Sequence, residues 1–320
     1  MAKLGRLAAS LPIPPHLRDR VEAAFDLVAP DRHLKTDELI ALATEHKADA
    51  VLMSLGMPMR AEHIAQLPAT VRVMATTSVG YDHIDVAAAN ARGIVVCNTP
   101  DVLTDATADT HMLLLLGAAR RAKEHVRNMD GGWKIRNGFF QGLGVDVTGK
   151  TMGIVGMGRI GRAVAERARG FRMPIVYHNR SRLSPDLEGD ARYFASLEEM
   201  LPYCQALSLN LPGGQGVLMT RERFAMLPKG AIFVNSARGS LVDEDALLDA
   251  LKSGHLGSAG LDVFQKEPNF DTRLNEVENT FLLPHIGSAT VETRTAMAEL
   301  AIDGIVAVLS GQTPTNVVKA

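Results

Sequence analysis

The sequence is poor in several features that mark particular classes of protein. It has only two cysteines, Cys97 and Cys204, and neither lies in a CxxC pair, which excludes a disulfide framework and favours a reducing compartment. Its 34 basic and 36 acidic side chains nearly cancel, so broad binding to nucleic acid or to a membrane surface has no electrostatic support. The apolar runs are too short to span a bilayer, and the start of the chain lacks an apolar signal core. We therefore expect a cytoplasmic protein.

What is present is an α/β pattern. The 320 residues exceed what one hydrophobic core usually organises, so we expect two domains. Short apolar runs alternate with amphipathic segments, which is typical of parallel sheets with crossover helices. Strands are predicted in residues 48–55, 71–77, 93–98, 151–156, 174–178, 206–212, 231–237, 258–264 and 280–284. Helices are predicted over Leu17–Phe25, Asp37–His46, Ile84–Arg92 and Val291–Leu309.

A segment between the two series of strands has a different character. Residues 105–126 carry a long apolar stripe that predicts a helix, and residues 128–150 are rich in glycine and contain the only tryptophan, Trp133. Two interpretations of the second stretch stay open: a packed connector, or an exposed arm that clasps a second subunit.

A glycine-rich turn follows the apolar strand TMGIV and opens the helix RIGRAVAERARGF. Its six residues match GxGxxG, and they are Gly156, Met157, Gly158, Arg159, Ile160 and Gly161. In this context the first glycine permits the tight turn, the second lets the backbone approach a pyrophosphate, and the third lets helix and strand pack closely. We predict a dinucleotide-binding loop, with a coincidental turn as the alternative.

A further absence lies about twenty residues later, where a dinucleotide fold that uses NAD usually keeps an Asp or Glu for the ribose hydroxyls. The end of the second strand reads YHNRSR, and the carboxylates Asp186 and Glu188 come only after it. Guanidinium groups and a hydroxyl suit a 2′-phosphate, so these residues favour NADPH. The proposed contacts are Asn179, Arg180, Ser181 and Arg182. The alternative is a pair of solvated arginines in a site that takes NADH.

Four chemically capable side chains follow other predicted strands. They are Arg238, Asp262, Glu267 and His285. In an open α/β sheet, ligands bind outside the carboxyl ends of the strands, so we expect these groups at the rim that holds the glycine loop. Reduction of a carbonyl by a nicotinamide needs a proton donor, a role that suits His285 if Glu267 orients it. Arg238 would hold a substrate carboxylate and polarise the carbonyl.

Taken singly, each of these residues has a structural alternative, such as a surface ion pair or a satisfied histidine. The other nine histidines show no metal-ligand spacing, so no metal site is expected.

From about Ala48 to the C-terminus, the sequence resembles the D-2-hydroxyacid dehydrogenase family, and within it the glyoxylate/hydroxypyruvate reductase branch. The motifs that carry the resemblance are VGYDHIDVAAANARGIVVCNTP, GIVGMGRIGRAVA, NSARGSLVDEDALLDAL, GLDVFQKEP and PHIGSAT. The segment YHNRSRL is similar to that of NADPH-preferring members.

The resemblance implies roles for individual residues. Its catalytic set would be Arg238, Glu267 and His285, and the first and last of these would also contact substrate and cofactor. The backbone N–H groups of Val79 and Gly80 would bind the substrate carboxylate, and Leu55 would line the other side of the pocket. Asp262 would meet the nicotinamide carboxamide. Further cofactor contacts would come from Thr107, Leu211, Pro212, Ala237 and Gly287, although NLPGGQGV departs from the commoner family sequence after Asn210.

The resemblance also implies a layout of two Rossmann-like or flavodoxin-like domains with parallel sheets. Residues 1–99 and 290–320 would form the substrate domain, and the NAD(P)-binding domain, 100–289, would be inserted into it. Hinges would lie near Asn98–Val102 and Pro284–Thr290. The helix over residues 106–121 and the arm around Trp133 would together form a homodimer interface.

The expected activity is NADPH-dependent reduction of a small 2-oxoacid, such as glyoxylate or hydroxypyruvate, to the D-2-hydroxy acid, with NADH as a possible second cofactor. Two alternatives remain: a dinucleotide-sensing protein similar to the corepressors of the family, and a reductase of larger aromatic 2-oxoacids. Formate dehydrogenase is disfavoured, because that branch pairs its histidine with a glutamine and this sequence has Glu267.

Overall fold

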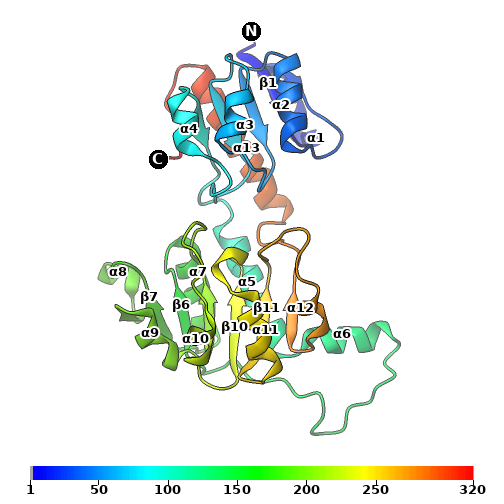
Figure 1. The fold of residues 1–320 in the computed structure, drawn as a ribbon, viewed down its shortest axis with the longest axis vertical. Helices are drawn as coiled ribbons and strands as arrows, with labels where there is room; N and C mark the ends of the chain where they lie inside the picture. Colours follow the sequence, from blue (N-terminus) through cyan, green and yellow to red (C-terminus); the bar gives the residue numbers. More distant parts are fainter. Residues whose placement is uncertain (1–2, 320) are drawn as a thin grey trace. The chain divides into compact units, whose positions relative to one another are not determined.

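The computed structural model describes residues 3–319, which divide into two compact units. One unit contains the residues up to Leu103 together with those from Ala289 onward, and the other contains Thr104–Ser288. A single β-sheet forms the centre of each unit (Figure 1). Among residues 3–319, no helix combines the length and the apolar content that a membrane crossing requires.

The sheet of the first unit has five parallel strands in the order β2-β1-β3-β4-β5. This strand order is that of flavodoxin-like folds. The strands are β1 Gly5–Ala9, β2 Phe25–Val28, β3 Ala50–Met53, β4 Val73–Thr76 and β5 Val95–Cys97. The helices are α1 Pro15–Ala24, α2 Thr36–Glu45, α3 Ala61–Gln66, α4 Val86–Ala91 and α13 Val291–Leu309.

The sheet of the second unit has seven parallel strands in the order β12-β11-β10-β9-β6-β7-β8. The order reverses beside β6, as it does at the switch point of a Rossmann fold. The strands are β6 Met152–Val155, β7 Ile175–His178, β8 Arg192–Phe194, β9 Ala206–Leu209, β10 Ala231–Asn235, β11 Leu256–Leu261 and β12 Thr280–Leu282. The helices are α5 Thr104–Ala119, α6 Ala122–Asp130, α7 Arg159–Gly170, α8 Pro185–Glu188, α9 Leu197–Met200, α10 Arg221–Ala225, α11 Glu244–Lys252 and α12 Arg273–Glu276, with short 3-10 turns at Leu201–Tyr203 and Gly239–Leu241.

The predicted fold class is therefore confirmed, and its central strands coincide with the apolar runs in the sequence. All four residues of β3, β4, β6 and β9 are buried. A strand buried on both faces reads as a continuous apolar run, which made these strands recognisable. Three strands were not predicted: β1, β2 and β8. The last two lie at sheet edges, where partial exposure admits charged residues such as Asp26 and Arg192.

The predicted long helix over residues 105–126 is wrong in one respect, because it is two helices. α5 ends at Ala119, and α6 begins after Arg121, whose backbone is left-handed with φ of +54°. The cause is the returning chain. Val145 donates its N–H to the Ala119 carbonyl at 2.8 Å, and a Cβ at Gly144 would lie only 2.4 Å from the same oxygen. A continuous helix would need that carbonyl for itself.

Residues 131–145 form an arm that extends from the end of α6 (Figure 1). Residues 131–141 are all exposed, including large apolar side chains. Trp133 is 64% exposed, Phe139 is 88% exposed and Phe140 is 83% exposed. The interpretation of this stretch as a packed connector is therefore wrong within the described chain.

Candidate active site

The sequence-predicted residues of the second unit lie in loops that leave one edge of its sheet. Because all neighbouring strands of this sheet are parallel, the carboxyl ends of β6, β7, β9, β10, β11 and β12 share that edge. The loops that leave it contain the glycine turn and the segments around residues 180, 211, 238, 262–267 and 285.

The glycine turn has the geometry that a dinucleotide requires. Gly156 has φ of +90°, and a Cβ there would lie 2.8 Å from the Asn210 carbonyl oxygen. A Cβ at Gly161 would lie 2.3 Å from the carbonyl oxygen of Gly156. A Cβ at Gly158, by contrast, would meet no atom within 4 Å, so the space in front of this residue is open. The open side faces the start of α7, where unpaired N–H groups and the helix dipole favour an anion. The turn therefore fits a pyrophosphate.

The tip of β7 is tied to this turn by Asn179. Its Oδ1 accepts the N–H of Met157 at 2.7 Å, while its carbonyl accepts the Tyr193 hydroxyl at 3.3 Å. The side chain predicted to contact the cofactor therefore also holds the glycine loop against the neighbouring strand.

The two arginines after β7, which the sequence analysis treated alike, differ in their partners. Arg182 donates from Nε and Nη2 to the two carboxylate oxygens of Glu188, at 2.8 and 3.0 Å. Arg180 is exposed and forms no ion pair within residues 3–319. No carboxylate follows β7 directly, but Glu188 of α8 supplies one as the partner of Arg182.

Arg238 is positioned by the end of β10. The Asn235 side chain accepts the Ala237 N–H at 3.0 Å and donates to the Arg238 carbonyl at 2.9 Å, which fixes the turn after the strand. Arg238 itself donates from Nη1 to the Ala237 carbonyl. A Cβ on Gly239 would lie 1.9 Å from the carbonyl carbon of Phe264. Only glycine lets the Arg238 turn approach the loop that carries Glu267 this closely.

A residue of α5 also contacts the turn that carries Arg238. His111, fully buried in that helix, places Nδ1 2.8 Å from the hydroxyl of Ser236. Burial lowers the pKa of His111 to about 3, so this imidazole is neutral in any ordinary buffer.

The central feature of the site is the pair formed by Glu267 and His285. Nδ1 of the imidazole lies 2.6 Å from Oε2 of the carboxylate, whose Oε1 accepts the Phe264 N–H at 2.9 Å. Burial raises the pKa of Glu267, but the hydrogen bonds from His285 and Phe264 and the positive charges of His285 and Arg238 outweigh it, and the net pKa is below the usual value. The carboxylate is therefore ionised at neutral pH.

Asp262 holds the loop that presents the imidazole. Its two carboxylate oxygens each accept a backbone N–H at 2.8 Å, from Ile286 and Gly287, and its side chain is almost fully buried. Burial raises the pKa of Asp262, and the two N–H bonds and the His285 charge only partly offset that rise. His285 has a left-handed backbone with φ of +55°, a conformation that a non-glycine residue keeps only when its surroundings impose it. Both oxygens of the acid predicted to meet the nicotinamide are thus already engaged by this loop.

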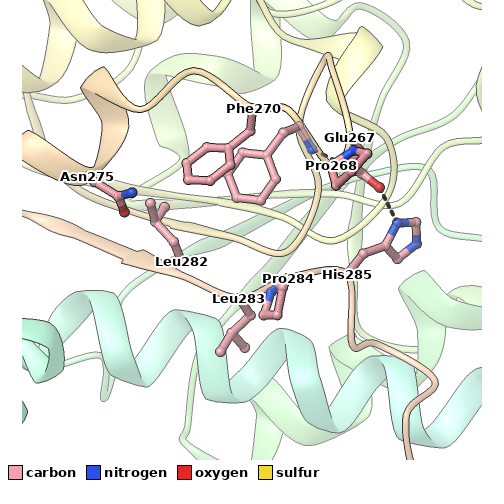
Figure 2. A pocket seen from close by; sticks show the side chains of 9 residues that line it. Glu267, Pro268, Phe270, Asn275, Leu282, Leu283, Pro284 and His285 are labelled. Atoms are coloured by element: carbon pink, nitrogen blue, oxygen red, sulfur yellow. Dashed lines mark hydrogen bonds and ion pairs between the residues drawn. The ribbon is translucent and has the colours of Figure 1, made fainter.

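A pocket of about 290 Å³ lies beside the pair (Figure 2). Its lining is mostly apolar and consists of Phe264, Glu267, Pro268, Phe270, Asn275, Leu282, Leu283, Pro284 and His285. The pocket lies on the Glu267 side of the imidazole, and the other ring nitrogen of His285 points away from it (Figure 2). A carbonyl protonated by that nitrogen would therefore not lie in this pocket.

The remaining predicted residues of this unit lie near the same loops. Leu211 packs against the glycine turn, since a Cβ on Gly156 would lie 2.7 Å from its Cδ2, and Pro212 follows it on the surface. Thr107 is buried in α5, and a Cβ on Gly287 would lie 3.6 Å from its hydroxyl oxygen.

Three of the five predicted substrate contacts belong to the first unit. Leu55 follows β3, and Val79 and Gly80 follow β4. The carbonyl of Val79 accepts a hydrogen bond from the Asn98 side chain at 2.8 Å, and that of Gly80 accepts one from the Ser78 hydroxyl at 2.7 Å. Neither of their N–H groups donates to an acceptor within the described chain, so this loop presents two N–H donors.

Sequence reasoning missed the residues that position the predicted ones: Asn235, Gly239, His111 and Glu188. A signal was present for the first two, because an Asn–x–x–Arg–Gly run directly after a buried strand indicates a turn stabilised by its own side chain. No local signal links His111 to Ser236 or Glu188 to Arg182, since both pairs depend on the packing.

Comparison with known proteins supplies the family. Residues 112–287, more than half of the chain, match the D-isomer specific 2-hydroxyacid dehydrogenase, NAD binding domain. The chain belongs to this family. As a D-2-hydroxyacid dehydrogenase it is an oxidoreductase with a domain that binds a nicotinamide dinucleotide.

Individual relatives of this dehydrogenase have narrower names. A "Glyoxylate reductase" of Thermococcus kodakarensis is 44% identical over 286 residues, which cover 87% of this chain and 85% of that protein. A "Glyoxylate/hydroxypyruvate reductase B" of Erwinia tasmaniensis is 41% identical and covers 90% and 93%. Among solved structures, an NADPH-dependent glyoxylate/hydroxypyruvate reductase from Sinorhizobium meliloti, in complex with NADP and malonate, has a TM-score of 0.86 and 35% identity, and covers 98% and 96%.

Proposed function

We propose that this dehydrogenase uses NADPH to reduce a small 2-oxoacid, such as glyoxylate or hydroxypyruvate, to the D-2-hydroxy acid. The observation that carries the proposal is the Glu267–His285 hydrogen bond of 2.6 Å at the sheet edge that also holds the glycine turn. The names of the relatives from Thermococcus kodakarensis and Erwinia tasmaniensis support the substrate class.

In the proposed reaction, His285 donates a proton to the carbonyl oxygen of the substrate. Its Nδ1 is occupied by Glu267, which leaves Nε2 for the substrate and fixes the tautomer. The ionised Glu267 holds the ring in position through this hydrogen bond. The nicotinamide, when bound, supplies the hydride to the carbonyl carbon.

Arg238 would hold the substrate carboxylate and polarise the carbonyl, because its charge is permanent. Its charge also lowers the pKa of Glu267, so the two side chains act on the same part of the site. The N–H groups of Val79 and Gly80 would bind the substrate carboxylate, and Leu55 would form an apolar wall. We retain the domain assignment of residues 1–99 and 290–320 to the substrate and 100–289 to the cofactor, with closure at the hinges excluding water.

The dinucleotide would bind at the glycine turn, with Asp262, Leu211, Pro212, Thr107 and Gly287 around it. The preference for NADPH is supported by the absence of an acid at the end of β7 and by the exposed Arg180, which forms no ion pair among residues 3–319. Replacing Arg180 and Arg182 together with glutamine should weaken NADPH binding far more than NADH binding. Equal weakening of both would show that these arginines do not recognise the 2′-phosphate.

The decisive experiment is steady-state kinetics with NADPH and NADH across glyoxylate, hydroxypyruvate, pyruvate, phenylpyruvate and hydroxyphenylpyruvate. We expect consumption of NADPH with the small acids and a D configuration in the product. Preference for the aromatic acids would replace the substrate assignment. If none of the acids were reduced while NADPH changed the oligomeric state, the protein would instead be a dinucleotide sensor of the corepressor kind.

We further propose a homodimer in the cytoplasm. The arm exposes Trp133, Phe139 and Phe140 together, and a second copy of the chain would cover them. Sedimentation should give twice the chain mass, and replacing the three aromatic residues with serine should reduce it to one. The two cysteines, both buried and free, agree with a reducing compartment.

A further inference from the structure

The loop after β7 holds an arginine that is already bound to an acid. The guanidinium of Arg182 and the carboxylate of Glu188 form two parallel hydrogen bonds, from Nε to Oε2 at 2.8 Å and from Nη2 to Oε1 at 3.0 Å. The Glu188 side chain keeps only 7% of its surface exposed, whereas that of Arg182 keeps 66%. The buried acid therefore anchors an arginine that otherwise lies in solvent.

The surrounding residues hold this pair in place. The Tyr177 hydroxyl accepts the N–H of Leu183, next to Arg182, at 3.0 Å. The Arg182 guanidinium lies 6.0 Å from the centre of the Tyr193 ring, and that ring lies tilted against the Tyr177 ring, with 5.3 Å between their centres. The pair is thus part of an ordered cluster on β7, β8 and the loop between them.

Such pairing has two consequences for a phosphate. The Nε and Nη2 edge, which forms two parallel bonds to a carboxylate or phosphate, is used by Glu188. The carboxylate also cancels the charge of Arg182, and it would repel a phosphate dianion placed on the same guanidinium. Arg180, two residues earlier, has neither constraint, because it forms no ion pair in the part of the chain that the structure describes.

We propose that Glu188 withholds Arg182 from the 2′-phosphate of the cofactor, so that Arg180 alone recognises the phosphate and the preference for NADPH over NADH is limited. Glu188 is thus a specificity-determining residue, although it does not itself contact the cofactor. This inference rests on the proposed use of NADPH at this loop.

Glu188 should withhold Arg182 from the phosphate at any pH near neutrality. Its hydrogen bonds and charge interaction with Arg182 lower the pKa of the Glu188 carboxyl, so it stays ionised at the pH of an ordinary assay.

The test compares two ligands that differ only by the phosphate, adenosine 2′,5′-bisphosphate and 5′-AMP, by calorimetry on the full chain. The ratio of their dissociation constants measures recognition of the 2′-phosphate without any hydride transfer. Glu188→Gln should raise the preference for the bisphosphate about tenfold, the scale of one charged hydrogen bond. The gain should disappear in the double variant Glu188→Gln, Arg182→Gln.

A matched control is Asp190→Asn, because Asp190 lies in the same segment but pairs with Arg169 at 2.7 Å. A gain as large in this control would attribute the effect to net charge and overturn the inference. An unchanged or weaker preference in Glu188→Gln would overturn it too, and would mean that Glu188 orients Arg182 for binding.

Two single variants keep the test decisive if Glu188→Gln does not fold. Arg180→Gln should remove most of the preference, and Arg182→Gln should change it little. A large loss in Arg182→Gln would overturn the inference. If the unaltered protein does not distinguish the two ligands, the proposed NADPH preference fails, whereas the gain in Glu188→Gln still decides the role of Glu188.

Discussion

Oε2 of Glu267 lies 2.6 Å from Nδ1 of His285, although the two residues are 18 positions apart in the chain. Hydrogen bonds from backbone N–H groups also hold each of these two residues in place. Glu267 accepts the Phe264 N–H, and the loop after His285 is bound by Asp262 through the N–H groups of Ile286 and Gly287. An imidazole held in this way has one nitrogen occupied and one available, which is the arrangement that a directed proton transfer requires.

Replacing His285 with alanine should remove the proposed proton donor. We expect the rate of oxoacid reduction to fall by about 10²–10⁴, the usual contribution of general acid catalysis. NADPH affinity, measured by fluorescence titration, should change little. A variant that kept nearly full activity would show that another group, or water, supplies the proton.

Replacing Glu267 with glutamine should lower kcat more than it changes the folded structure. The glutamine can still accept a hydrogen bond from His285, but an uncharged group holds the ring less strongly than a carboxylate does. We therefore expect kcat to fall about tenfold at every pH, the scale of one charged hydrogen bond. The comparison is a kcat profile from pH 5 to 9, with Glu276→Gln, an exposed acid of α12, as the control. Superimposable profiles would contradict the role of Glu267.

Two alanine substitutions in the glycine turn should affect different properties, one the binding of NADPH and the other the stability of the fold. Gly158→Ala places a Cβ in open space, and its φ of −77° suits any residue, so the melting temperature should stay the same. The Cβ would instead hinder the approach of the pyrophosphate, and we expect binding of NADPH to weaken by about 1–3 kcal/mol, as overpacking does elsewhere.

Gly161→Ala places its Cβ 2.3 Å from the Gly156 carbonyl oxygen, between the helix and its strand. The free energy of unfolding should fall by about 1–3 kcal/mol in this variant. Calorimetric melting and titration with NADPH measure both properties on the same samples. A loss of stability in Gly158→Ala, with unchanged binding, would place the dinucleotide elsewhere.

The sequence allowed the two parallel sheets to be predicted because their central strands are buried on both faces and read as unbroken apolar runs. The helix Val291–Leu309 was predicted to the residue, and in the structure Thr290 caps its start and accepts the Thr293 N–H. The edge strands β2 and β8 and the break after Ala119 were not predictable. They depend on partners distant in the chain, such as the Val145 N–H that binds the Ala119 carbonyl.

Some residues of the candidate site could likewise be predicted from the sequence, and others could not. Polar side chains at strand ends, such as Arg238 and His285, are conspicuous in a sequence because they interrupt apolar runs at a functional edge. The groups that position them are not, because His111 looks like an ordinary member of an apolar helix until the fold brings it to Ser236. The pairing of Arg182 with Glu188 likewise depends on where α8 lies.

His111 should make the protein sensitive to mild acid. Burial lowers its pKa from 6.5 to about 3 in the folded chain. Below about pH 6.5 the unfolded chain binds a proton that the folded chain does not, so the free energy of unfolding falls as the pH falls toward 3, by at most about 1.4 kcal/mol per pH unit. His111→Gln can still hydrogen-bond Ser236 but does not titrate, and urea unfolding between pH 7.5 and 4.5 should show a smaller pH dependence in this variant. The control for the substitution itself is His33→Gln, at an exposed position. An equal slope in His111→Gln and the unaltered protein would mean that His111 does not stay neutral in the folded state.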